Sequence, residues 1–189
     1  MLNEKLLSHY NLIIESLKNN GRALLQNDEE LFDEINTSLA QLLSQENISD
    51  RDLMPLFCLL DHCPRPDKRF ENHLLMIAPK LKTADSRVAW MGIAHKHILE
   101  RQQRDGDPIP QELIPILKLY MSDKKNQHWE VLEWVLRTVV MIGPLSLQLK
   151  SDIEAIRPTI LSLFNRHQRH YFEILELLQK NWQQLGIKK

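Results

Sequence analysis

Apolar side chains recur every three or four residues along most of this chain, which is the spacing of amphipathic α-helices. Short alternating runs rich in Val, Ile, Thr and aromatic residues, which are typical of strands, are absent from the sequence. The helical pattern occupies residues 3–19, 27–43, 49–61, 68–82, 86–103, 110–121, 128–142, 151–164 and 168–185. The sequence therefore predicts an all-α protein of about eight to nine helices.

A proline recurs inside the apolar stretches that open the later pairs of helices. Pro79, Pro115 and Pro158 are separated by 36 and then 43 residues, close to the period of stacked helix-pair repeats. A two-helix unit of about 40 residues cannot bury its apolar faces alone, so neighbouring pairs must pack on one another. We expect each mid-helix proline to remove a backbone hydrogen bond and to bend its helix, which suits an outer curve.

Glycine marks the expected ends of helices. Gly21, Gly106, Gly143 and Gly186 each follow a helical pattern, where a left-handed cap residue is common. Gly92 is the exception, because it lies inside the pattern of residues 86–103.

One pair of predicted helices carries a motif. Residues 113–123 place a proline in the first helix and Asp123 in the turn, and residues 131–143 finish a second helix in Ile-Gly. This arrangement resembles a HEAT repeat. Residues 85–88 are similar to the Asp-x-x-Val-Arg turn of that family, with Arg placed before Val, whereas the third copy has Asn165 in place of the aspartate.

The resemblance covers residues 68–186 and implies a fold. It implies a right-handed α-solenoid of stacked antiparallel helix pairs, in which the second helices line a concave face that binds partners. The expected organisation is one helical-repeat domain over residues 1–189, with three HEAT-like pairs in 68–186. The N-terminal helices of residues 1–67 either cap this stack or cover its groove.

Charge and hydropathy narrow the expected partners. The 24 Lys and Arg residues against 25 Asp and Glu give a net charge of −1, which disfavours nucleic acid and anionic membranes as partners. The apolar run at residues 139–142 is far short of the roughly 18 residues of a membrane span. The first residues lack the pattern of a secretory signal, so a cytoplasmic protein without membrane contact is expected.

The concave face predicted by the resemblance would be lined by the polar sides of the second helices. Trp90 is expected to be the most exposed tryptophan, because its helix face also carries basic side chains. Trp and Arg are the residues that most often anchor protein interfaces. The candidate partner-binding residues are Arg87, Trp90, His97, Arg101, Glu130, Glu133, Arg137, Glu173 and Lys180. The competing interpretation is a set of solvated helix faces with intrahelical pairs such as Glu133 to Arg137.

No metal or cofactor is predicted. Cys58 and Cys63 flank His62, but a structural zinc site needs four ligands in two pairs and the sequence offers no second pair. Cys58 lies in an apolar run, where a free thiol behaves as a small hydrophobic side chain.

Two functions are open from the sequence. The first is a non-enzymatic scaffold or adaptor that binds a protein or peptide partner on its concave face. The alternative is an enzyme that resembles the HEAT-like DNA glycosylases, or a related nucleic-acid-binding protein, acting on alkylated bases. Trp129 and Glu133 would then face the base, while Arg137 and the basic residues of 165–170 would extend toward phosphate. That family carries Asp and a basic cleft where this chain has Glu and no basic excess, so no catalytic residue is assigned.

Overall fold

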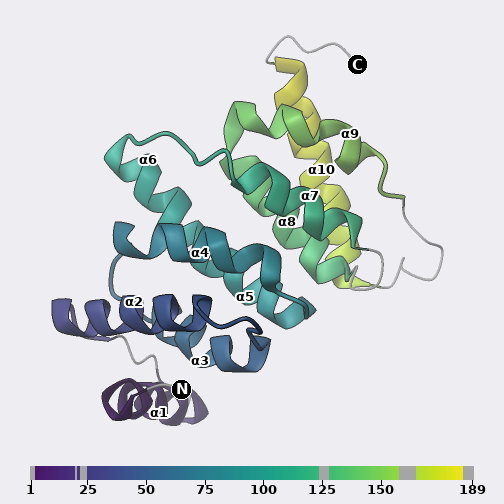
Figure 1. The fold of residues 1–189 in the computed structure, drawn as a ribbon. Helices are drawn as coiled ribbons and strands as arrows, with labels where there is room; N and C mark the ends of the chain where they lie inside the picture. Colours follow the sequence, from purple (N-terminus) through teal and green to yellow (C-terminus); the bar gives the residue numbers. More distant parts are fainter. Residues whose placement is uncertain (1–2, 20, 22–24, 124–127, 158–164, 185–189) are drawn as a thin grey trace. The chain divides into compact units, whose positions relative to one another are not determined.

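The computed structural model describes residues 3–19, 21, 25–123, 128–157 and 165–184. Helices are the only regular elements in these ranges, which confirms the all-α prediction (Figure 1). The chain forms two compact units, Met1–Pro108 and Ile109–Lys189. The solenoid arrangement stays a prediction, and each unit is described by itself.

Unit 1 begins with three helices that the sequence pattern places correctly. They are α1 (Glu4–Lys18), α2 (Glu29–Leu43) and α3 (Asp50–Asp61). Asn3, Asp28 and Ser49 precede them, and each side chain accepts hydrogen bonds from the first backbone N–H groups of its helix. These caps explain why the three helices start where they do.

The rest of unit 1 is more divided than the pattern predicts. Its elements are η1 (Lys68–Phe70), α4 (Glu71–Ile77), η2 (Ala78–Lys80), α5 (Ala84–Ala94), η3 (His95–Glu100) and α6 (Arg101–Asp105). Residues 68–82 are therefore not one helix: η1 and η2 are 3₁₀ turns on either side of α4. The segment η3 is π-helical and widens the turn between α5 and α6.

The prolines do not act as mid-helix bends in the way we expected. Pro79 lies in the 3₁₀ turn η2, since proline cannot donate the hydrogen bond that would continue an α-helix. Pro115 is the third residue of α7, where its missing N–H costs no intrahelical hydrogen bond. Pro55 lies past the first turn of α3, and Pro158 lies outside the described residues.

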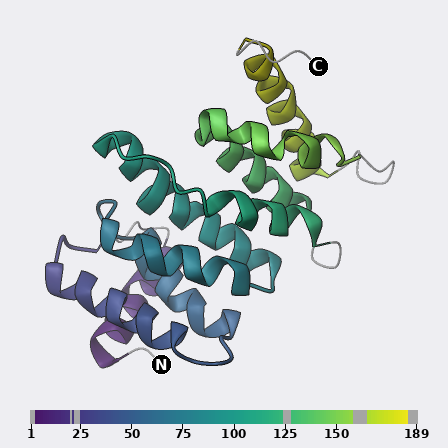
Figure 2. The same cartoon turned by 45° about the horizontal axis from the view of Figure 1, so that its top comes forward.

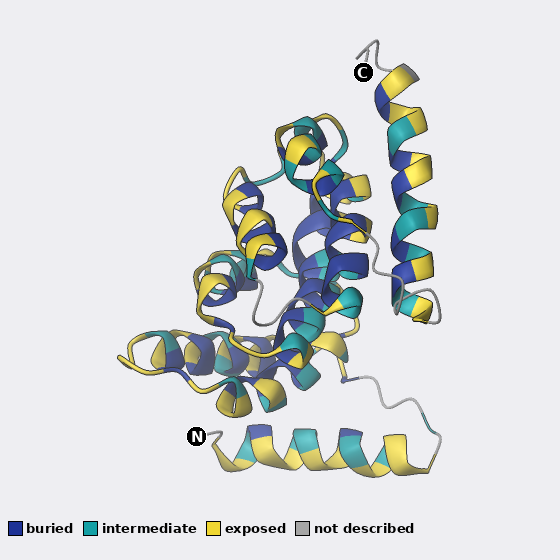
Figure 3. Ribbon diagram, turned by 90° about the vertical axis from the view of Figure 1, so that its right-hand side faces the viewer, coloured by how far each residue is buried: buried dark blue, intermediate teal, exposed yellow. Residues whose placement is uncertain are grey.

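Aromatic and aliphatic side chains from α2, α3, α4 and α5 form the core of unit 1. Phe32 and Phe70 pack edge to face with ring centroids 6.0 Å apart, and Phe70 meets the His97 ring at 5.1 Å. Helix α1 adds Leu6 and Ile13 from one side only, and its other side is exposed (Figure 3).

Unit 2 contains two long parallel helices joined by shorter elements (Figure 2). Its elements are α7 (Leu113–Ser122), α8 (Trp129–Met141), η4 (Gly143–Leu149), α9 (Lys150–Glu154) and α10 (Arg166–Gln184). Glu133 in the second turn of α8 meets His167 in the first turn of α10, and just past the end of α8 Ser146 accepts a hydrogen bond from Trp182 near the end of α10. The two helices therefore lie side by side and run in the same direction.

Two of the predicted glycine caps have left-handed backbone. Gly106 (φ 75°) ends α6 and Gly143 (φ 56°) follows α8, and an added Cβ would meet nothing at either position. Gly186 lies outside the described residues. Among the described helices, none combines the length and the apolar composition that crossing a bilayer requires.

Candidate functional site

The candidate residues from the sequence divide between the two units. Arg87, Trp90, His97 and Arg101 belong to unit 1, and Glu130, Glu133, Arg137, Glu173 and Lys180 belong to unit 2. Burial separates the two sets further, because all four candidates of unit 1 are interior side chains.

The expectation that Trp90 is exposed is wrong. Its side chain is fully buried, and its indole Nε1 donates to the carbonyl oxygen of Leu74 at 2.8 Å. A buried tryptophan that satisfies its single donor is a packing residue. Trp90 therefore joins α5 to α4.

The expectation of an exposed face is also wrong for Arg87. The side chain is 3% exposed, and its Nε and Nη2 donate to the carbonyl oxygen of Leu81. Arg87 thus stabilises the turn that leads from η2 into α5.

His97 is likewise buried, at the centre of the π-helical segment η3. Its Nδ1 lies 3.1 Å from the backbone N of Asp67 and accepts a hydrogen bond from it, and its Nε2 lies 3.0 Å from the carbonyl oxygen of Leu60. One ring nitrogen therefore accepts and the other donates, which defines a neutral imidazole. Burial lowers the pKa of His97 to about 4, so the ring stays neutral at physiological pH.

Arg101 is the most buried charge of unit 1, at 1% exposure. Its guanidinium pairs with Glu71 and with Asp107 at 2.8 Å, and lies 3.5 Å from Asp105. Lys68 and Arg104 also pair with Asp107 and Asp105, so the three carboxylates of this cluster are matched by three cations. Arg101 therefore joins α6 to α4 and to the loop that follows α6.

In unit 2 the structure brings polar side chains from α8 and α10 together. Glu133 is 4% exposed, and its Oε1 accepts hydrogen bonds from Arg137 Nη2 at 2.6 Å and Nε at 3.0 Å. Its Oε2 lies 2.7 Å from His167 Nδ1, and Oε1 lies 3.3 Å from His170 Nδ1. One buried carboxylate thus has three basic neighbours that are themselves partly exposed.

The ionisation of Glu133 follows from these contacts. Burial raises the pKa of a carboxyl group, but the hydrogen bonds from Arg137 and His167 outweigh it, so the pKa of Glu133 is below its ordinary value. Glu133 is therefore a carboxylate that orders the side chains around it.

An accessible surface extends from this cluster along both helices. Arg137 lies over the ring of Trp134, with its guanidinium carbon 5.8 Å from the ring centroid. Val140 lies two turns beyond Glu133 and Leu177 two turns beyond His170, and they are 42% and 59% exposed. We call this surface the α8/α10 face; it comprises Glu133, Trp134, Arg137 and Val140 of α8 with His167, His170 and Leu177 of α10.

The remaining candidates of unit 2 border the α8/α10 face. Glu130 is half-buried in the first turn of α8, and Glu173 and Lys180 are exposed on the outer side of α10. Figure 3 shows this outer side as the exposed stripe of the helix beside the C-terminal label. Of the nine candidates, hydrogen bonds join Glu133 and Arg137 directly.

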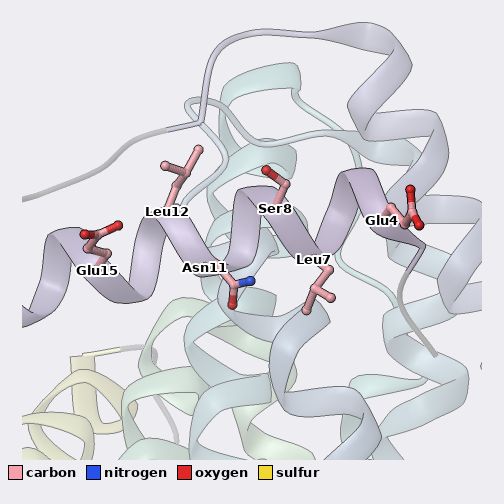
Figure 4. Close-up of a pocket in the computed structure, with 6 residues that line it drawn as sticks. All are labelled: Glu4, Leu7, Ser8, Asn11, Leu12 and Glu15. Atoms are coloured by element: carbon pink, nitrogen blue, oxygen red, sulfur yellow. The ribbon is translucent and has the colours of Figure 1, made fainter.

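Two shallow hollows lie in unit 1. The first is lined by Glu4, Leu7, Ser8, Asn11, Leu12 and Glu15, all on the outer side of α1 (Figure 4). The second lies along α2 and is lined by Asn3, Glu30, Asp33, Glu34, Thr37, Ser38 and Gln41. All six residues of the first hollow come from a single helix, so it is an open helix side rather than an enclosed site.

Both cysteines are free thiols. Burial raises the pKa of Cys58 to about 11 and that of Cys63 to about 12, so both stay protonated and unreactive at neutral pH. Within the described ranges, no three His, Cys, Asp or Glu side chains are grouped in a way that could hold a metal ion.

The sequence interpretation missed that His167 and His170 bind Glu133. It placed both histidines in a basic stretch that could extend toward phosphate, without a link to the carboxylate. Their spacing of three residues puts them on one side of a helix, which was the available signal. The register between α8 and α10, which brings that side to Glu133, is a tertiary property.

The fold and this face define an all-helical protein with a mixed polar and apolar surface on one pair of parallel helices. Comparisons of the chain with models of known protein families, with curated proteins and with solved structures find no match.

Proposed function

We propose that this chain is a non-enzymatic helical-repeat module that binds a protein or peptide partner on the α8/α10 face. The observation that supports this proposal is the combination of exposed Arg137, Val140 and Leu177 with half-buried Trp134 on two adjacent helices. Arg and Trp dominate the energetics of protein interfaces, and exposed aliphatic side chains beside them supply apolar area to bury. The HEAT resemblance, which places second helices on the binding face, favours the same two helices.

Preorganisation of this face also supports a binding role. Glu133 holds Arg137, His167 and His170 by hydrogen bonds, so these side chains lose less freedom when a partner docks. An exposed arginine without such a partner would have to be ordered by the binding event itself.

The contacts of unit 2 favour binding over the glycosylase-like alternative. That alternative needs Trp129 and Glu133 to face a base. The Trp129 ring packs against the rings of Tyr171 and Phe172, with centroids 5.7 Å and 5.9 Å away. The Glu133 carboxylate is paired with Arg137. A carboxylate already neutralised by an arginine offers less stabilisation to a cationic sugar.

Site-specific photo-crosslinking tests the proposal. A benzoylphenylalanine at Leu177 is compared in cells with the same group at Leu119, an exposed leucine of α7 that serves as the control position. We expect a discrete protein adduct from position 177 that is lost when Trp134 is changed to Ala, and none from position 119. Equal adducts from both positions, or none from position 177, would refute the proposed function.

A further inference from the structure

The first turn of α10 concentrates basic side chains at the border of the α8/α10 face. Arg166, His167, Arg169 and His170 follow one another there, and Arg137 of α8 reaches the same carboxylate as the two histidines. We call these five residues the basic cluster. The described residues of α10 place no acidic side chain in its first turn.

The basic cluster is not neutralised within its unit. Glu133 is shared by Arg137, His167 and His170, and neither Arg166 nor Arg169 forms an ion pair with any residue that the structure describes. Both arginines are exposed. The excess of positive charge extends to the whole of unit 2, which contains 11 Lys and Arg residues and 8 Asp and Glu residues.

This arrangement costs stability in the free protein. Cationic side chains at the start of a helix interact unfavourably with the helix macrodipole and repel one another. Departures from local preference of this kind are expected at functional sites. An anion placed between the arginines would attract both of them and would itself interact favourably with the helix macrodipole.

We propose that the basic cluster binds a carboxylate or phosphate group carried by an acidic peptide segment of the partner. This inference rests on the proposed function and names the chemistry of the partner. Arg166 and Arg169 provide forked donors for the oxygens of either group, and Arg137 extends the cluster onto α8.

A peptide fits this surface better than a nucleic acid does. Val140 lies about one turn beyond Arg137 and Leu177 two turns beyond His170, and both are exposed, so a peptide can place an apolar side chain there while its acidic group meets the arginines. A long polyanion would instead need many cations, and the chain as a whole carries a net charge of −1.

The experiment measures binding of short probes to the full chain by titration calorimetry at two salt concentrations. The probes are a peptide with glutamates next to leucine, the same peptide with one phosphoserine, its glutamine version, and an oligothymidine of equal length. The variant Arg166→Gln/Arg169→Gln removes two exposed cations, and Lys80→Gln/Arg157→Gln is a control with the same change of net charge at other exposed positions.

We expect the acidic peptides to bind Arg166→Gln/Arg169→Gln at least about tenfold more weakly, with a shallower dependence of the affinity on salt. Their affinity for the control variant should change less than about twofold. The ratio of the glutamate to the phosphoserine affinity then identifies the preferred anion. Three results would overturn the inference: no binding of either acidic peptide, equal binding of the glutamine peptide, or tighter binding of oligothymidine. If in that case the adduct at position 177 persists, the proposed function stands and only the anionic partner is refuted.

Discussion

Replacing Trp90 with Phe distinguishes an interior residue from a binding residue. The change removes the hydrogen bond from the indole to the carbonyl of Leu74, which contributes about 1 kcal/mol. That carbonyl also accepts from the backbone N of Ala78, so it does not become a buried orphan acceptor. The smaller ring leaves a gap of about 40 Å³ in a fully buried position, which adds about 1 kcal/mol.

We therefore expect Trp90→Phe to lower the free energy of unfolding by about 2 kcal/mol. An exposed aromatic residue that awaits a partner would change stability by less than about 0.5 kcal/mol after the same substitution. The change is measured by urea unfolding followed by far-UV circular dichroism, together with hydrogen exchange of the amides of unit 1. Met76→Gln is the control, because Met76 is 57% exposed on the neighbouring helix α4.

If Trp90→Phe and Met76→Gln unfolded at the same urea concentration, this result would contradict the burial of Trp90. Loss of crosslinking at position 177 in a Trp90→Phe protein that is still fully folded would assign Trp90 a binding role instead. The expected outcome is the reverse: lower stability with unchanged crosslinking, because Trp90 belongs to the core of unit 1.

Two further predictions concern stability. Burial lowers the pKa of His97 to about 4, so between about pH 6.5 and 4 the unfolded chain binds a proton that the folded chain does not, and stability falls as the pH drops. The variant His97→Gln keeps a donor and an acceptor but cannot titrate. Between pH 7 and pH 5 its free energy of unfolding should fall by about 2 kcal/mol less than that of the unchanged protein. An equal fall in both proteins would be inconsistent with a neutral buried ring. Gly143→Ala should cost about 1 kcal/mol in thermal unfolding, because φ is 56° although the added methyl group meets nothing; an unchanged Tm would show that the backbone relaxes.

Helix positions were predictable where the helix has one buried stripe and a capping side chain. The predicted ranges for α1, α3 and α10 end within about two residues of the observed ones, because local periodicity and caps determine them. The range for α8 agrees equally well from periodicity alone, since His128 before it makes no capping hydrogen bond with its side chain. The division of residues 68–82 and 86–103 was not predictable in this way. A 3₁₀ or π turn keeps nearly the same apolar spacing as an α-helix, and its occurrence depends on contacts such as the one between His97 and Leu60.

The candidate site was predictable only in part, for a related reason. Glu133 and Arg137 lie four residues apart on one helix, so their pairing follows from spacing alone. Arg87, Trp90 and Arg101 were assigned to an exposed face because polar and amphipathic side chains usually mark one. Their partners are backbone carbonyls and carboxylates that the tertiary fold supplies, and no local pattern shows these.

The clusters around Arg101 and Glu133 differ in the balance between their charges. Arg101 is enclosed by three carboxylates, so its cluster is closed and holds elements of unit 1 together. Glu133 has the opposite arrangement, because one buried carboxylate holds three basic side chains whose outer parts remain accessible. The excess positive charge near Glu133 lies on Arg166 and Arg169, which are exposed and form no ion pair with a residue that the structure describes. The carboxylates around Arg101 are also met by Lys68 and Arg104, whereas Arg166 and Arg169 have no such counterpart among the described residues, so the cluster of Glu133 is where the protein can offer charge to a partner.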